Sequence, residues 1–207
     1  MSFELSQQEG EFIVHLARNT VKLYLEEGKC PPPKNNFPKL FEKCGVFVTI
    51  SVVTGSGKEL RGCIGYPYPT SPLVEAVIDS AVNAATADPR FEPMTVEELD
   101  QVVFEVSVLT PPELIQIDNP KEYVSKIKAG EDGLIIEHNW RKGLLLPQVP
   151  LEWGWGEEEF LCQCCMKAGL PPDNWLTKDV KIYKFKAIIF EEETSNGVIK
   201  RLNLKRT

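Results

Sequence analysis

The sequence lacks both glycine patterns that commonly bind phosphate groups. Neither a Gly-x-x-x-x-Gly-Lys-Ser/Thr run nor a Gly-x-Gly-x-x-Gly run occurs among the 207 residues. This excludes the phosphate loops of P-loop nucleotidases and of dinucleotide-binding folds. Histidine is also scarce, with two residues in the chain. We therefore expect no cofactor of these classes and no metal site.

Long apolar runs are missing as well. No stretch approaches the roughly 18 apolar residues that a membrane span requires. The first residues, Met1-Ser2-Phe3-Glu4, lack the basic and then apolar segments of a secretory signal. The net charge of −7 disfavours whole-surface attraction to nucleic acid or to an anionic membrane. We expect a cytoplasmic protein that does not bind nucleic acid or a membrane through its overall charge. Because the cytoplasm is reducing, we also expect its six cysteines to be free thiols.

One short segment combines a reactive residue type with glycines inside a strand-like run. It reads Leu60-Arg61-Gly62-Cys63-Ile64-Gly65. Glycine weakens a strand unless a bulge, a bend or a close ligand requires the missing side chain. Side chains alternate along a strand, so Arg61 and Cys63 should project from the same face. The pattern predicts a cysteine with a cation beside it.

That pairing makes Cys63 a candidate nucleophile. A guanidinium close to a thiol favours the thiolate and so lowers the pKa of the cysteine. Residues two apart along a strand are roughly 6.5 Å apart, within reach of an arginine side chain. The alternative is that Cys63 is a small buried hydrophobe, which is a common role of free cysteine.

The same six residues resemble the central motif of the AMMECR-type domain family. Further blocks resemble the family in the expected order, at residues 88–94, 105–110, 143–149 and 165–171, the last two being similar to archaeal and bacterial members. The resemblance spans nearly the whole chain. It implies a bilobal fold and, for some members, a pathway shared with radical SAM and Memo-type proteins. It implies no reaction, since the family's biochemical function is not established.

Local patterns predict helices that flank antiparallel strands. Ser6 and Glu9 form a capping box that opens an amphipathic helix ending at Gly28. Residues 46–53 and 60–65 are typical of two hairpin strands joined by a turn at 54–58.

A later segment, residues 102–109, alternates between two faces. Its even-numbered residues are apolar and should face the core, whereas Glu105 and Ser107 give the opposite face its polar groups. Hairpins, rather than helical crossovers, join most of the expected strands. We predict one α+β domain over residues 1–207, with antiparallel sheet, flanking helices and a smaller lobe inserted at about residues 71–100.

Two catalytic arrangements of Cys63 remain open. The first is a Cys-His-acid set with His138 as the base and Glu105 as the orienting carboxylate. His138 lies outside the segments that resemble the family, which counts against this set. The second is a Cys63 thiolate paired with Arg61 or Arg90, without histidine.

A ligand pocket without covalent chemistry is a third alternative. Gly62 and Gly65 would let backbone N–H groups approach a ligand, and Arg61 and Arg90 would bind an anionic group bidentately. The structural alternative is that these arginines form salt bridges to Glu105 or Asp88.

Two further features have a structural and a functional interpretation. Cys162 and Cys165 form a Cys-x-x-Cys pair, but a zinc ribbon needs a second pair or suitably spaced histidines, so a packed helical stripe is favoured over a metal site. Trp153, Trp155 and Trp175 either anchor a partner surface or close the core.

The sequence thus predicts a cleft that binds a small anionic or nucleotide-like ligand, with cysteine-dependent chemistry at Cys63 and no assignable reaction. A non-enzymatic protein-interaction or regulatory module is the alternative. The residues expected to line the cleft are Arg61, Gly62, Ile64, Gly65, Arg90, Phe91, Glu105 and Ser107.

Overall fold

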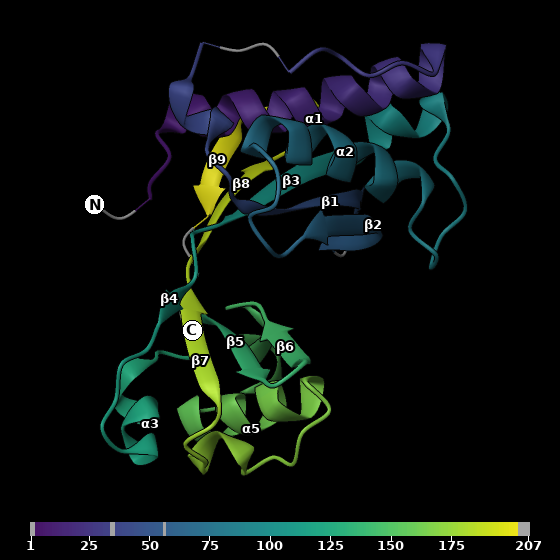
Figure 1. Cartoon of the computed structure of the whole chain (residues 1–207). Coiled ribbons are helices and arrows are strands. Elements are labelled where there is room, and N and C mark those ends of the chain that lie inside the picture. The colour runs from purple at the N-terminus through teal and green to yellow at the C-terminus, as the bar shows by residue number, and fades with distance from the viewer. Residues whose placement is uncertain (1–2, 34–35, 56, 203–207) are drawn as a thin grey trace. The chain divides into compact units, whose positions relative to one another are not determined.

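The structure is a computed structural model that describes residues 3–33, 36–55 and 57–202 (Figure 1). The chain divides into two compact units. Unit 1 comprises the described residues up to Leu109 together with Ile188–Leu202, and unit 2 comprises Thr110–Ala187. Each unit has its own sheet, its own helices and its own hydrophobic core. The predicted α+β class with antiparallel sheets is confirmed.

Unit 1 consists of a five-stranded sheet, in the order β2-β1-β3-β8-β9, with two helices on one face (Figure 1). Its strands are β1 (Gly45–Thr54), β2 (Gly57–Tyr66), β3 (Val102–Leu109), β8 (Ala187–Glu192) and β9 (Ile199–Leu202). Its helices are α1 (Gln7–Glu27) and α2 (Leu73–Thr86), with short 3-10 helices η1 (Pro38–Phe41) and η2 (Val96–Gln101).

Helix α1 begins and ends where its capping signals predict. Ser6 and Glu9 form the capping box, and Gly28 ends the helix in the left-handed conformation with φ of 68°. The apolar face between these caps, which includes Ile13 and Ala17, is buried in the core of unit 1. Local sequence therefore determined this element.

The sheet of unit 1 has one face packed against the helices and one face without them. The even-numbered residues of β3, from Val102 to Val108, lie in the helix-packed core as predicted. Because side chains alternate, Glu105 and Ser107 project from the second face. β1 and β2 form the predicted hairpin, in which Ser56 of the expected turn lies outside the described residues.

Unit 2 consists of a four-stranded sheet, in the order β4-β7-β5-β6, packed against short helices. Its strands are β4 (Glu113–Leu114), β5 (Gly133–His138), β6 (Arg141–Leu145) and β7 (Lys181–Phe185). Its helices are α3 (Tyr123–Lys126), α4 (Val149–Trp153) and α5 (Glu157–Lys167), with 3-10 helices η3 (Pro120–Glu122) and η4 (Asn174–Leu176).

The prediction of a smaller lobe at residues 71–100 is wrong. Helix α2 lies within that segment and packs on β1, β2 and α1 inside unit 1. Its small residues, such as Ala81 and Ala84, are buried there and allow a close approach to the sheet. The second unit is instead Thr110–Ala187, because β4 and β5 both pair with β7 and the resulting sheet has a separate core.

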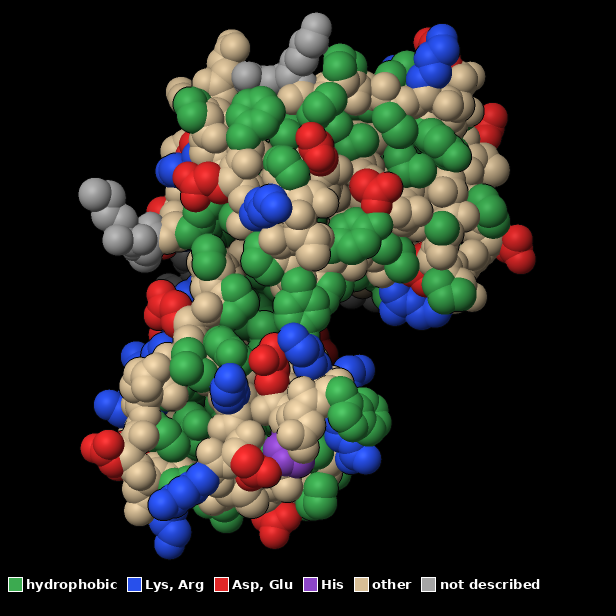
Figure 2. All heavy atoms as spheres, in the orientation of Figure 1, with side chains coloured by type: hydrophobic (Ala, Val, Ile, Leu, Met, Phe, Trp, Pro, Cys, Tyr) green, Lys and Arg blue, Asp and Glu red, His purple; other side chains and the backbone are tan. Residues whose placement is uncertain are grey.

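The surface carries charges of both signs. On the face drawn in Figure 2, acidic and basic side chains are interspersed with hydrophobic ones over both units. None of the helices in the described part of the chain combines the length and the apolar character needed to cross a bilayer.

Candidate functional site

A row of polar side chains crosses three neighbouring strands on the second face of the unit 1 sheet. Thr49 of β1 lies directly opposite Cys63 of β2 and directly opposite Glu105 of β3. Directly opposite residues in antiparallel strands project from the same face. Thr49 Oγ1 donates to Cys63 Sγ at 3.3 Å, and Ser107 Oγ donates to Glu105 Oε1 at 2.9 Å. The fold thus brings Cys63 and Glu105 into one row, with Thr49 between them.

Thr49 was not among the predicted site residues. Its place in the row depends on the pairing of β1 with both neighbouring strands, which no local pattern specifies. A signal was present, because Thr49 and Ser51 alternate with the apolar residues Val48 and Ile50. That alternation assigns Thr49 to the face opposite the core.

Arg61 does not pair with Cys63, contrary to the prediction. The register between β1 and β2 shifts, so that Ile50 pairs with Gly62 whereas Ser51 pairs with Leu60. Arg61 is the extra residue of a β-bulge, which re-aims its side chain. Its Nε and Nη2 donate to the two carboxylate oxygens of Glu98, at 2.7 and 3.1 Å.

Arg90 is the cation beside Cys63. Arg90 Nη2 donates to the Cys63 carbonyl oxygen at 3.3 Å, and the Arg90 charge favours the Cys63 thiolate. Arg90 itself is held by Asp88, to which its Nε and Nη2 donate at 2.9 and 2.7 Å. Of the two predicted carboxylate partners, Asp88 therefore binds an arginine, whereas Glu105 binds Ser107.

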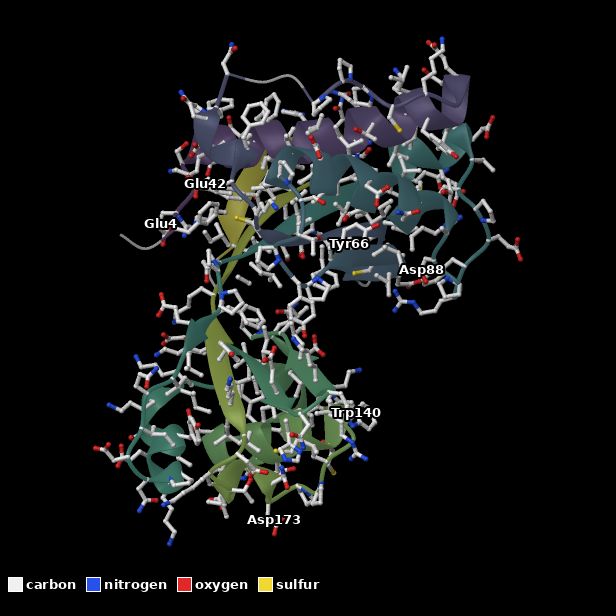
Figure 3. The ribbon with its side chains drawn as sticks, viewed as in Figure 1. Glu4, Glu42, Tyr66, Asp88, Trp140 and Asp173 are labelled. Atoms are coloured by element: carbon white, nitrogen blue, oxygen red, sulfur yellow. The ribbon has the colours of Figure 1, made fainter. Side chains whose placement is uncertain are left out.

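Asp88 links the loop after α2 to β2 through hydrogen bonds (Figure 3). Besides Arg90, its carboxylate accepts from the backbone N–H of Cys63 at 2.8 Å. The side chain is almost completely buried. The hydrogen bonds from Arg90 hold the pKa of Asp88 well below its usual range, against the opposing effect of burial. Asp88 is thus an ionised anchor for the backbone of the central motif.

Replacing Asp88 with asparagine should cost about 1–2 kcal/mol at pH 7, because hydrogen bonds to a charged group are replaced by neutral ones. The pKa of Asp88 is lower in the folded than in the unfolded state, so its contribution is complete above the unfolded pKa of about 3.9 and declines as the pH falls below it. Urea unfolding between pH 7 and pH 3 measures this. The gap between wild type and Asp88→Asn should narrow below about pH 4; a constant gap would contradict the assignment.

The resting Cys63 is a thiol and not a thiolate. Burial raises the pKa of Cys63, and this outweighs the lowering by the Thr49 hydrogen bond and by the Arg90 charge. The predicted lowering of the Cys63 pKa is therefore wrong, because burial dominates and the charges of Glu105 and Asp88 oppose that of Arg90. Burial also raises the pKa of Glu105, although its hydrogen bond from Ser107 opposes the rise. The row thus combines two groups that are biased toward their protonated forms.

Phe91 lies between the two predicted arginines. Its ring centroid is 5.9 Å from the guanidinium carbon of Arg61 and 5.6 Å from that of Arg90. Both distances fall within the range of a cation–π interaction. Phe91 therefore helps to position both guanidinium groups.

The glycines of the motif serve close packing of the backbone. A Cβ atom on Gly62 would lie 2.0 Å from the Ala84 carbonyl oxygen of α2, and one on Gly65 would lie 2.1 Å from the Val46 carbonyl oxygen of β1. The space opposite each missing side chain is thus filled by protein and not by a ligand. Ile64, between them, packs partly buried against the core of unit 1.

The residues of the Cys-His-acid set are divided between the two units. His138 belongs to unit 2, where its Nε2 lies 2.6 Å from Asp179 Oδ2. Cys63 and Glu105 belong to unit 1 and have Thr49 and Ser107 as their side-chain partners. The sequence suggested this set only through the types of residue that it contains.

Three of the remaining cysteines, Cys162, Cys164 and Cys165, and all four tryptophans belong to unit 2. Cys165 is buried in its core and Cys162 packs partly buried against it, while all six cysteines are free thiols, as expected. No cluster of three or more metal-ligating side chains occurs within the described residues. Trp175 is buried, whereas Trp153 is 70% exposed and stacks on Trp155 at a centroid distance of 6.0 Å.

Comparisons with known proteins match nearly the whole chain. The AMMECR1 family profile matches residues 14–190. Protein PH0010 of Pyrococcus horikoshii is 56% identical over 203 residues, which are 97% of this chain and 98% of that protein. Protein MJ0810 of Methanocaldococcus jannaschii is 54% identical over 196 residues, 94% of this chain and 96% of that protein. The crystal structure of the uncharacterized protein PH0010 has a TM-score of 0.85 at 54% identity and covers 98% of this chain and 100% of its own.

Proposed function

The chain belongs to the AMMECR1 family, and from this premise we propose that it binds a small anionic ligand on the second face of the unit 1 sheet. The observation that carries the proposal is the row of Cys63, Thr49 and Glu105. A thiol, a hydroxyl and a carboxyl meet on a sheet face that α1 and α2 leave free. Polar groups that converge on one half-buried surface are typical of a binding site.

Arg90 is the group that would hold the anion. Its side chain is 52% exposed, whereas that of Arg61 is 15% exposed. Nε and Nη2 of Arg90 contact Asp88, while Nη1 has no partner among the residues that the structure describes. A guanidinium has five N–H donors, so Arg90 can bind a carboxylate or phosphate and keep its contact with Asp88.

Glu105 suits an anionic ligand because of its raised pKa. A carboxyl group that protonates more readily than an exposed one repels a nearby anion less. A ligand on the row would then lie against the Cys63 thiol. Nucleophilic chemistry at Cys63 would require the thiol to lose its proton, and Glu105 could accept that proton only in its ionised form.

The test is the rate at which iodoacetamide labels each cysteine at pH 7.5, measured by peptide mass spectrometry. Without ligand, Cys63 should label more slowly than the exposed Cys30, because its pKa is raised and alkylation requires the thiolate. Phosphate, pyrophosphate and citrate serve as probe anions. At least one should slow the labelling of Cys63 severalfold further in the wild type and have no effect in Arg90→Met.

The matched control is Arg201→Met, which removes an exposed arginine paired with Glu4 at 2.8 Å in the same unit. It should retain the protection that Arg90→Met loses. Labelling of Cys63 that ignores every anion would overturn the binding proposal. If Cys63 labels faster than Cys30, the assignment of Cys63 as a neutral thiol is wrong.

A protein-interaction module is the second candidate function. It is favoured by Trp153, whose large apolar side chain is mostly exposed next to Trp155. Exposed aromatic residues frequently anchor protein interfaces. In this alternative, small anions do not change the rate at which Cys63 is labelled.

A further inference from the structure

Unit 2 contains a pocket of its own at the tip of the β5–β6 hairpin. The pocket has a volume of about 350 Å³. Residues 138–141 of the hairpin form one side of it, and Leu170, Pro171 and Asn174 form the other. All of these residues belong to unit 2, so the pocket shares no residue with the row around Cys63.

Trp140 occupies a position that packing does not explain. The pairing of His138 with Arg141 leaves Asn139 and Trp140 as a two-residue turn. Asn139 adopts the left-handed conformation with φ of 55°, which asparagine tolerates. Trp140, the second turn residue, is not among the residues with positive φ, and its indole is 83% exposed (Figure 3). The ring therefore has a face free to stack on a ligand.

Arg141 is a cation without a carboxylate partner. Of the five arginines within the described residues, the other four each pair with a glutamate or aspartate. Arg141 instead donates through Nη1 to the Gly169 carbonyl oxygen, and its guanidinium carbon lies 5.1 Å from the Trp140 ring centroid. In a chain of net charge −7, this leaves an uncompensated positive group at the pocket.

The remaining polar groups of the pocket favour a ligand that carries hydrogen-bond acceptors. No aspartate or glutamate is among the lining residues, although Asp179 holds the His138 ring from outside. The side-chain nitrogen of Asn174 is buried and has no hydrogen-bond partner among the described residues. A buried donor without a partner is uncommon in native proteins. The lining therefore presents the Arg141 cation without an opposing carboxylate, which favours an anionic ligand.

We propose that this pocket binds a small molecule that combines a planar ring with an anionic group. The ring stacks on the exposed face of Trp140, and the carboxylate or phosphate is held by Arg141. Stacking on an aromatic side chain and bidentate binding by arginine are both well suited to such ligands. Mononucleotides and aromatic carboxylates share this chemistry.

The test is isothermal titration of the full chain with two probes, AMP and 4-hydroxybenzoate, which distinguish the two sources of the chemistry. At least one probe should bind the wild type. Arg141→Met and Trp140→Ala should each weaken its binding about tenfold or more, as expected when a charged hydrogen bond or a stacking contact is lost. The controls Trp153→Ala and Arg201→Met remove another exposed tryptophan and another exposed arginine and should bind as the wild type does.

Three results would overturn the proposal. The first is the absence of binding by both probes at about 10 mM, a concentration that detects even millimolar affinity. The second is unchanged affinity in Trp140→Ala; because this side chain is exposed, its removal leaves the fold intact, so the variant remains informative even if Arg141→Met unfolds. The third is adenosine binding as tightly as AMP, or phenol as tightly as 4-hydroxybenzoate, since neither neutral analogue carries the anion. The labelling of Cys63 is a separate measurement, so failure here leaves the proposal for unit 1 untouched.

Discussion

Replacing Gly62 with alanine should destabilise unit 1 by about 3 kcal/mol, at the upper end of what overpacking usually costs. The added Cβ would lie 2.0 Å from the carbonyl oxygen of Ala84. That oxygen belongs to the backbone of α2, so it cannot rotate away as a flexible side chain would. Either the helix or the strand must move, and both are part of the same core. Urea unfolding followed by circular dichroism measures the loss.

Gly55→Ala is the matched control, because it adds the same methyl group in the same hairpin. A Cβ atom on Gly55 meets no heavy atom within 4 Å. This variant should unfold within about 0.5 kcal/mol of the wild type, as surface substitutions usually do. Equal stability of the two variants would show that β2 and α2 are not in the close contact described above.

Replacing Arg18 with methionine should destabilise the protein by about 3–5 kcal/mol, the usual cost of removing one partner from a buried ion pair. Arg18 is 6% exposed and Glu192 is fully buried. Arg18 Nε donates to Glu192 Oε1 at 2.6 Å, and its Nη1 donates to the Leu99 carbonyl oxygen at 2.9 Å. Without the guanidinium, the Phe104 backbone N–H, at 3.0 Å, is the one donor left to the Glu192 carboxylate among the residues that the structure describes.

Lys22→Met is the control for this prediction, since Lys22 lies one turn further along α1. Its ammonium group is 4.0 Å from Glu26, and both side chains are largely exposed. Loss of such a pair changes stability by less than about 0.5 kcal/mol. The double variant Arg18→Met with Glu192→Leu should recover part of the stability, because no buried charge remains. If Arg18→Met is as stable as Lys22→Met, the pair is not buried in solution.

Features that depend on neighbours in the chain were predictable. The capping box of Ser6 and Glu9 and the alternation of β3 are local, so the sequence contains all the groups that determine them. A second capping box, formed by Thr95 and Glu98 at the start of η2, is local in the same way. The sequence could not show that Glu98 also receives Arg61, because the two residues lie 37 positions apart.

The candidate site shows the same limit. Cys63, Glu105 and Arg90 were predicted, but the sequence left open whether Arg61 or Arg90 is the cation beside Cys63. One extra residue at Arg61 resets the alternation of β2, and strand register is decided by the partner strand. The pKa of Cys63 likewise depends on burial, which exists only after the chain has folded.

The sequence by itself determined the family, the α+β class and the segment that forms the candidate site, because motifs, caps and alternation are local properties of the chain. Tertiary structure alone decided that Thr49 lies between Cys63 and Glu105, that Asp88 anchors the Cys63 backbone, and that the second unit begins at Thr110. The physical reason is common to all three. Each depends on hydrogen bonds and packing between segments distant in sequence, and these form only when the strands pair and the cores close.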